Sequence, residues 1–247
     1  VGGPLTALET LRALVPSGAV TSMTPRRMED LGALYGFALY EATLPVLNKS
    51  IAVGATRRLA IGGGARDRVI ALIDSKRVAT MWRGDMKGCA DDLTLILPPA
   101  TTQAPERLQL LVEITGRLAY GIQMQEDALR GKGIVGCSEH VQGCSSSTPL
   151  VTLDGMAVPR KGGEWTQWAL PLDSAQLQRW PNSTDVEHSI VDLQKTLGTQ
   201  DAAPPPQLYQ GSFSIGAGDV ADCWIDMKGW NKGTVSVNGV DLGRYWC

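Results

Sequence analysis

The sequence has neither the charge surplus nor the long apolar runs that mark two large classes of protein. Its 23 Lys and Arg are offset by 25 Asp and Glu, which gives a formal net charge of −2. A nucleic-acid-binding protein normally carries a basic surplus that faces the phosphates. No apolar run approaches the roughly 18 residues needed to cross a bilayer. We therefore expect no nucleic-acid partner and no membrane span.

The sequence also lacks the signatures of several common catalytic centres. Its two histidines, His140 and His188, lie in polar segments without a Gly-x-Ser-x-Gly serine nearby, which argues against a serine triad. The glycine-rich stretch 62–66 has no Gly-Lys-Ser or Gly-Lys-Thr ending, which a phosphate-binding loop needs. We expect no catalytic residue, cofactor or metal site in this chain.

Turn formers and short apolar segments dominate what is present. There are 28 Gly, 14 Pro and 7 Trp against only 2 Phe. Exposed Trp rings often stack on sugars, but Trp also fills β-sandwich cores, and the core is the favoured interpretation of each single Trp. Asn238-Gly239, between two alternating segments, is a strong hairpin signal. The pattern predicts an all-β fold, a β-sandwich or jelly roll, with strands near residues 35–39, 69–73, 77–82, 93–97, 107–115, 234–237 and 240–246.

The chain divides into three predicted parts. Leucines in residues 5–15 recur at helical spacing, so residues 1–27 are expected to form a short helical leader that packs on a neighbouring domain. A Gly- and Ser-rich stretch over residues 131–148 marks the best candidate boundary. We therefore predict a first jelly-roll domain over residues 28–134 and a second over residues 135–247.

Cysteine and sequon usage favours an oxidising compartment. Cys137 and Cys144 lie in one short glycine-rich stretch, and a disulfide-closed loop is the favoured interpretation. A zinc site from this pair and His140 is the disfavoured alternative, because no fourth ligand is visible. Asn48 and Asn182 each begin an Asn-x-Ser/Thr glycosylation motif. Together these features predict a lysosomal, vacuolar or secreted protein.

Several motifs resemble one enzyme family. The longest is Gly-Trp-Asn-Lys-Gly-Thr-Val-Ser-Val-Asn-Gly-Val-Asp-Leu-Gly-Arg-Tyr-Trp over residues 229–246, which resembles a signature near the end of glycoside hydrolase family 35 β-galactosidases. Residues 35–45 resemble the opening strand of that family's first jelly roll, and residues 110–121 its closing segment. Residues 164–172 resemble the entry to the second. The matches follow the family's order over about residues 5–246, and the lysosomal acid type is the most similar variety.

The resemblance implies a non-catalytic role for this chain. In the family, an N-terminal TIM barrel carries both catalytic glutamates, and no Asn-Glu dipeptide of the acid/base type occurs here. One contact carries over: Tyr120 matches the tyrosine that reaches from the first jelly roll into the galactose pocket. Arg117 is expected to fix the strand end through hydrogen bonds. The family usually has Asn where Ile114 and Ala119 stand, and it continues with a final strand that is absent after Cys247.

Three functional hypotheses follow from the residues and the resemblance. The first is a non-catalytic C-terminal β-domain chain, processed or a fragment, of a protein that hydrolyses terminal β-D-galactosides. Its expected partners are the N-terminal barrel of the same protein and β-galactoside glycans. The alternative is a catalytically inactive, galactosidase-derived structural or glycan-binding subunit of a larger assembly. The third is an independent lectin, which needs a sugar pocket within these 247 residues.

Overall fold

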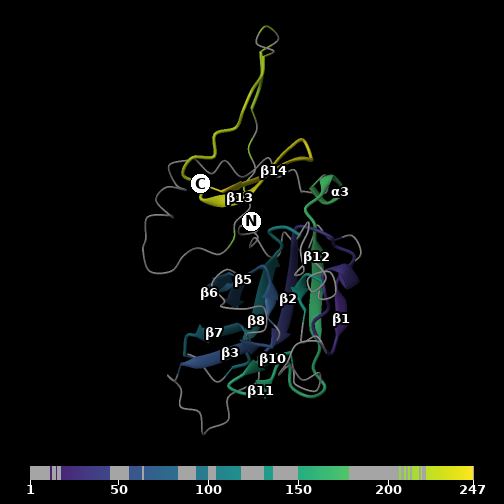
Figure 1. Ribbon diagram of the computed structural model, residues 1–247, viewed down its shortest axis with the longest axis vertical. Coiled ribbons are helices and arrows are strands. Elements are labelled where there is room, and N and C mark those ends of the chain that lie inside the picture. The colour runs from purple at the N-terminus through teal and green to yellow at the C-terminus, as the bar shows by residue number, and fades with distance from the viewer. Residues whose placement is uncertain are drawn as a thin grey trace.

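The protein is all-β in the part that the structure describes, as the sequence predicts. The structure is a computed structural model (Figure 1). It describes residues 12, 15, 18–44, 56–62, 64–82, 93–99, 104–117, 131–135, 150–177, 206, 209, 211, 213–216, 218 and 221–246. Among these residues, no helix is long and apolar enough to cross a membrane.

The larger sheet has six antiparallel strands. Their order is β1 (Val20–Ser22), β12 (Trp165–Leu170), β2 (Phe37–Thr43), β8 (Arg107–Glu113), β5 (Arg68–Ile73) and β6 (Lys76–Trp82). The central strands are apolar on both faces. Ala38 and Tyr40 point into one buried cluster, while Leu39 points into another with Leu111 and Trp168. Because both faces are covered, these strands read as continuous apolar runs rather than as alternating ones.

The smaller sheet packs on one face of the larger sheet. It has the order β11 (Met156–Ala157), β10 (Val151–Leu153), β3 (Arg57–Ile61) and β7 (Leu93–Leu97), all antiparallel. Its strands run across those of the larger sheet in Figure 1. Leu59 and Leu97 are fully buried in the shared cluster, and each contributes about 1.5–3 kcal/mol to folding. The two sheets therefore form one β-sandwich.

Strands β10, β11 and β12 belong to this sandwich, although the sequence pattern places residues 150–170 in a second domain. Strand β12 pairs with β1 on one side and β2 on the other, and β10 pairs with β3. Trp165 in β12 is fully buried, and its Nε1 donates a hydrogen bond to Val158 O over 3.1 Å. The prediction that these strands belong to a second domain was wrong, because β12 is part of the larger sheet and pairs with the edge of β2. The predicted boundaries otherwise stay predictions.

The remaining elements are short. Strand β4 (Ala65–Arg66) pairs with β9 (Gly133–Ile134), and single turns form η1 (Glu29–Leu31) and α3 (Ser174–Leu177). The predicted C-terminal hairpin is confirmed as β13 (Lys232–Val237) and β14 (Val240–Trp246). Its turn residues have φ values of 52° at Asn238 and 78° at Gly239, which is the backbone that an Asn-Gly type I′ turn requires.

The helical leader expected over residues 1–27 receives no support from the structure. Residues 5–11 lie outside the described residues. Where the description resumes, residues 20–22 form β1, which extends the larger sheet as an edge strand. Val15 packs against Leu39 and Trp168 on the outer face of that sheet. Arg12 also donates a hydrogen bond to Glu41 Oε2 and lies 5.1 Å from the ring centroid of Trp168. These contacts support the docking of this segment, and the helix stays a prediction.

Candidate functional site

Most residues singled out from the sequence lie outside the described residues. These are Tyr120, the cysteine pair Cys137 and Cys144, and the two sequon residues Asn48 and Asn182. Their roles stay predictions.

Arg117 lies within the described part of the chain. Its Nε donates a hydrogen bond to Leu34 O over 3.0 Å, and its Nη2 donates one to Glu29 Oε1 over 2.6 Å. Burial alone would raise the pKa of Glu29, but hydrogen bonds from Lys132 N, its own N–H and Arg117 hold that pKa below its usual value. Arg117 thus connects the segment after β8 to the loop before β2.

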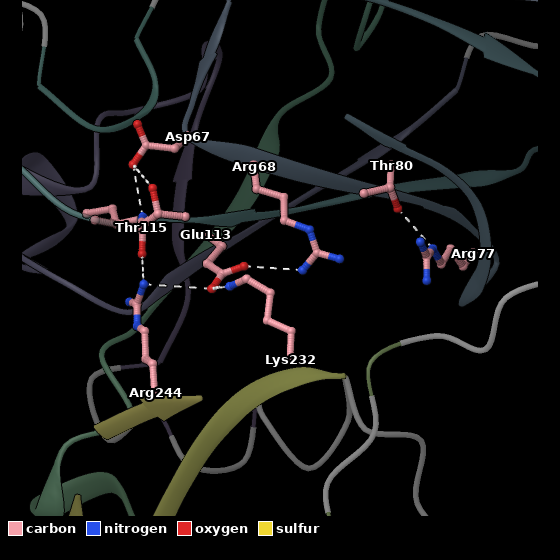
Figure 2. Close-up of polar contacts among 9 residues, drawn as sticks. Asp67, Arg68, Arg77, Thr80, Glu113, Thr115, Lys232 and Arg244 are labelled. Carbon is pink, nitrogen blue, oxygen red and sulfur yellow. Dashed lines mark hydrogen bonds and ion pairs between the residues drawn. The ribbon is translucent and has the colours of Figure 1, made fainter. Parts of the chain in front are cut away.

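Among the described residues, Glu113, the last residue of β8, is the carboxylate with the most cationic partners. The Glu113 side chain is only 4% exposed, and its carboxylate faces three cations from three strands (Figure 2). Arg68 Nη1 donates a hydrogen bond to Oε2 over 3.2 Å, and Lys232 Nζ donates one to Oε1. Arg244 Nη1 lies 3.7 Å from Oε1. We call these four residues the Glu113 cluster.

Strand register brings the cluster together. Arg68 begins β5 and is the direct cross-strand partner of Glu113, so their side chains share one face at one end of the sheet. On the hairpin, Lys232 is paired with Trp246, two residues beyond Arg244. Side chains two residues apart in a strand share a face, so the hairpin presents both cations toward Glu113. Arg244 Nη1 also donates to the backbone oxygen of Ile114.

A stacked aromatic pair lies beside the Glu113 cluster, where the C-terminal hairpin meets the ends of β5, β6 and β8. We call this contact region the junction. Trp82, the last residue of β6, stacks on Trp246 with ring centroids 4.8 Å apart and planes at 19°. The Arg68 guanidinium lies 5.1 Å from the Trp82 centroid, and Lys232 Nζ lies 5.4 Å from it and 4.9 Å from that of Trp246. A stacked pair contributes about 0.5–1.5 kcal/mol beyond its buried area, and each cation–π contact a similar amount.

A second buried ion pair lies next to the cluster. Asp67 accepts hydrogen bonds from Lys132 Nζ over 2.9 Å, from Thr115 N over 2.9 Å and from Thr115 Oγ1 over 3.1 Å. Burial would raise the pKa of Asp67, but these hydrogen bonds and the charge of Lys132 lower it below its usual value. The pair connects β9 and the segment after β8 to the start of β5.

Tyr40 supports the same β9 segment from inside the sandwich. Its hydroxyl donates to Arg26 O over 2.8 Å and accepts from Ile134 N over 3.3 Å. Full burial raises the pKa of the phenol, so it stays neutral. Gly133, with φ 91°, passes so close to this hydroxyl that a Cβ would lie 2.3 Å from it. Only glycine fits there.

The chemistry of this arrangement is that of a junction. Each acid in it is matched with cations and donors, and the described residues contain no group of three His, Cys, Asp or Glu side chains that could hold a metal. Sequence reasoning missed the junction because Glu113 and Lys232 are 119 positions apart. Arg244 and Trp246 fall on one face of the predicted hairpin, but Lys232 joins them only through the register shift between Val235 and Ser236, which the sequence does not signal.

Comparison with known proteins identifies the two sides of the junction. Residues 25–140 match the family model described as the first all-β domain of β-galactosidase, and residues 206–247 match the model of its galactose-binding domain. A β-galactosidase from Felis catus is 31% identical over 244 residues, which cover 98% of this chain and 31% of the relative. β-Galactosidase 17 from Arabidopsis thaliana and a human β-galactosidase are each 28% identical over 242 residues, or 96% of this chain.

The chain spans about a third of the length of these curated relatives. Arg68, Trp82 and Glu113 lie within the residues matched by the first model, and Lys232, Arg244 and Trp246 within those matched by the second. The Glu113 cluster and the Trp82–Trp246 stack therefore join the two matched regions.

Proposed function

This chain belongs to the β-galactosidase family through its first all-β domain and its galactose-binding domain, and we propose that it is the non-catalytic β-domain part of such an enzyme. The whole protein, of the glycoside hydrolase family 35 kind, would hydrolyse terminal β-D-galactosides by double displacement on two carboxylates of a TIM barrel. This part would support the barrel and help to close the galactose pocket.

The junction between the two matched regions is the observation that carries this proposal. Glu113 faces three cations while only 4% of its side chain is exposed, and breaking such a pair on one side leaves uncompensated buried charge. The contacts thus favour one fixed arrangement of the hairpin on the sandwich. A fixed pair of β-domains is what a supporting role beside a catalytic domain requires.

Arg117 supports the proposed role of Tyr120. Arg117 lies three positions before Tyr120 in the sequence. Its guanidinium donates hydrogen bonds to Leu34 O and to Glu29. The start of the segment that carries this tyrosine is therefore anchored to the sandwich. A phenol can donate a hydrogen bond to a sugar hydroxyl and pack on the sugar face, so Tyr120 would contact galactose in the pocket of the barrel.

The compartment is part of the same proposal. A lysosomal, vacuolar or secreted glycoprotein would carry glycans on Asn48 and Asn182 and a disulfide between Cys137 and Cys144. Peptide mass mapping of the natural protein, with and without reduction and glycosidase treatment, tests all three modifications.

The test of the enzymatic role uses the whole protein. We expect it to release the chromophore from a chromogenic β-galactoside, and removal of this entire β-region to abolish a stable, active enzyme. Tyr120→Phe should raise KM for the galactoside a few-fold, while Tyr35→Phe, on an exposed tyrosine of the sandwich, should leave KM unchanged. A stable barrel with full activity after the truncation would refute the supporting role.

A galactosidase-derived subunit without catalysis is the second candidate. It is favoured by Ile114, which stands where the family usually has Asn and whose side chain is 2% exposed in the sandwich core. A whole protein that folds and binds β-galactosides but hydrolyses none of them would establish this candidate instead.

A further inference from the structure

One carboxylate joins the two flanks of the segment that carries Tyr120. Arg117 lies before this tyrosine in the sequence, and Lys132 lies after it. Arg117 Nη2 donates a hydrogen bond to Glu29 Oε1 over 2.6 Å, and the backbone N–H of Lys132 donates one to Glu29 Oε2 over 3.0 Å. Glu29 is the first residue of η1 and lies outside the segment. Its carboxylate therefore fixes both flanks to one point on the sandwich.

The flank after Tyr120 is shaped to receive this carboxylate. Gly131 has a φ of 69°, and a Cβ at this position would lie 2.6 Å from Glu29 Oε2. A side chain at residue 131 would push the carboxylate away from the N–H of Lys132, so the close approach depends on glycine. The adjacent backbone is held as well, because Met28 N donates a hydrogen bond to Lys132 O over 2.8 Å.

A second carboxylate joins the same two flanks at a more buried position. Asp67 accepts hydrogen bonds from Lys132 Nζ on one flank and from the N–H and hydroxyl of Thr115 on the other; Figure 2 shows the contacts with Thr115. The side chains of Asp67 and Lys132 are 9% and 3% exposed, whereas that of Glu29 is 28% exposed. Breaking the buried pair would destabilise the whole sandwich. The half-exposed Glu29 can be changed at a lower cost.

We infer that Glu29 is a positioning residue for galactoside binding and acts through Tyr120. The inference rests on the galactose contact proposed above for that tyrosine. A segment fixed at both flanks has fewer conformations to lose on binding than one fixed at a single flank, and such preorganisation raises affinity. The hydrogen bond from Arg117 to Leu34 O holds the first flank only. The Glu29 carboxylate couples that flank to the second.

Hydrogen exchange of the whole protein tests the coupling without any need for activity. Glu29→Gln keeps the size of the side chain but leaves one acceptor oxygen where the carboxylate has two, so it releases one flank. We expect peptides from residues 118–130 to exchange about tenfold faster, which corresponds to the loss of one charge-assisted hydrogen bond. Peptides from β2 and β8 should not change, which shows that the sandwich is intact.

Kinetics of the whole enzyme test the positioning role. Glu29→Gln should raise KM for a chromogenic β-galactoside a few-fold and leave kcat unchanged, because the lost interaction serves binding rather than the chemical step. A smaller fraction of folded enzyme would lower kcat instead. In the double variant with Tyr120→Phe, the two effects on KM should not multiply, because Glu29 acts through Tyr120.

A carboxylate elsewhere on the sandwich provides the matched control. Asp154, an exposed residue in the turn between β10 and β11, also accepts a hydrogen bond from a backbone N–H, that of Arg58 over 2.8 Å. Asp154→Asn removes one negative charge and weakens a contact of the same kind. It should change neither the exchange of residues 118–130 nor KM.

The results separate the inference from the proposed function. Unchanged exchange of residues 118–130 in Glu29→Gln overturns the coupling, whatever the activity. Faster exchange with an unchanged KM, or effects that multiply in the double variant, overturns the positioning role in an enzyme whose KM responds to Tyr120→Phe. A whole protein that hydrolyses no β-galactoside, or a KM that ignores Tyr120→Phe, refutes the proposed function or its galactose contact, and the positioning role falls with it.

Discussion

Glu113→Gln should loosen the C-terminal hairpin without unfolding the sandwich. The change keeps the side-chain volume but removes the carboxylate that Lys232 and Arg244 share with Arg68. Removing one partner of a fully buried ion pair costs about 3–5 kcal/mol. The three cations are 17%, 11% and 31% exposed, so water screens part of this loss, and we expect about 2–3 kcal/mol.

Hydrogen exchange followed by mass spectrometry measures this loss locally. A cost of about 2–3 kcal/mol corresponds to roughly 30- to 150-fold more frequent opening, and peptides from residues 232–246 should show it while peptides from β2 and β5 do not. Local opening with an intact core is the expected behaviour of an element held mainly by side-chain contacts.

The matched control lies at the other end of the same strand. Glu106, just before β8, pairs with Arg57, whose side chain is 2% exposed. Glu106→Gln should destabilise the sandwich as a whole and leave the ratio of hairpin exchange to core exchange unchanged. Equal hairpin exchange in the Glu113 and Glu106 variants would refute the idea that Glu113 holds the hairpin in place.

Three further changes test the neighbouring contacts. Trp82→Ala removes the stack on Trp246 and two cation–π contacts; we expect a loss of about 2 kcal/mol in urea unfolding, and no loss would show the rings to be unimportant. Tyr40→Phe deletes a buried hydroxyl that bridges Arg26 O and Ile134 N, so it should cost about 1–3 kcal/mol by the same measurement. The pKa of Asp67 is lower in the folded chain than its usual 3.8, so the stability it contributes is complete above that value and is lost as pH falls below it. Asp67→Asn should flatten the acid limb of a stability-against-pH curve, and an unchanged acid limb would contradict the assignment.

Local signals in the sequence predicted the local parts of the fold. Asn238-Gly239 specifies its own hairpin, because only a few residue types adopt the left-handed backbone of a type I′ turn. The turn at Asp74 and Ser75, with φ values of 47° and 66°, joins β5 to β6 in the same way. The strand predicted near residues 35–39, from the alternation of Tyr35, Phe37 and Leu39 with smaller residues, is observed as β2 over Phe37–Thr43.

Long-range pairing was not visible in the same signals. Strand β12 inserts between β1 and β2, and its Trp168 pairs with Leu39, far away in the sequence. Nothing in the apolar pattern of residues 165–170 says which sheet they extend, so chain order assigned them to the wrong domain. The partners of Glu113 could not be predicted for the same reason. A single charged residue at the end of a strand does not indicate which distant residue pairs with it.

The polar character of the junction follows from the size of the hairpin. A two-stranded hairpin is at best marginally stable alone in water, so β13 and β14 need a surface to hold them. The end of the sandwich offers them the terminal residues of β5, β6 and β8 rather than an apolar sheet face. Ion pairs add little net stability there compared with apolar packing, but wrong arrangements leave charges unpaired. The Glu113 cluster therefore sets the orientation of the hairpin, and the Trp82–Trp246 stack supplies the apolar part of the attachment.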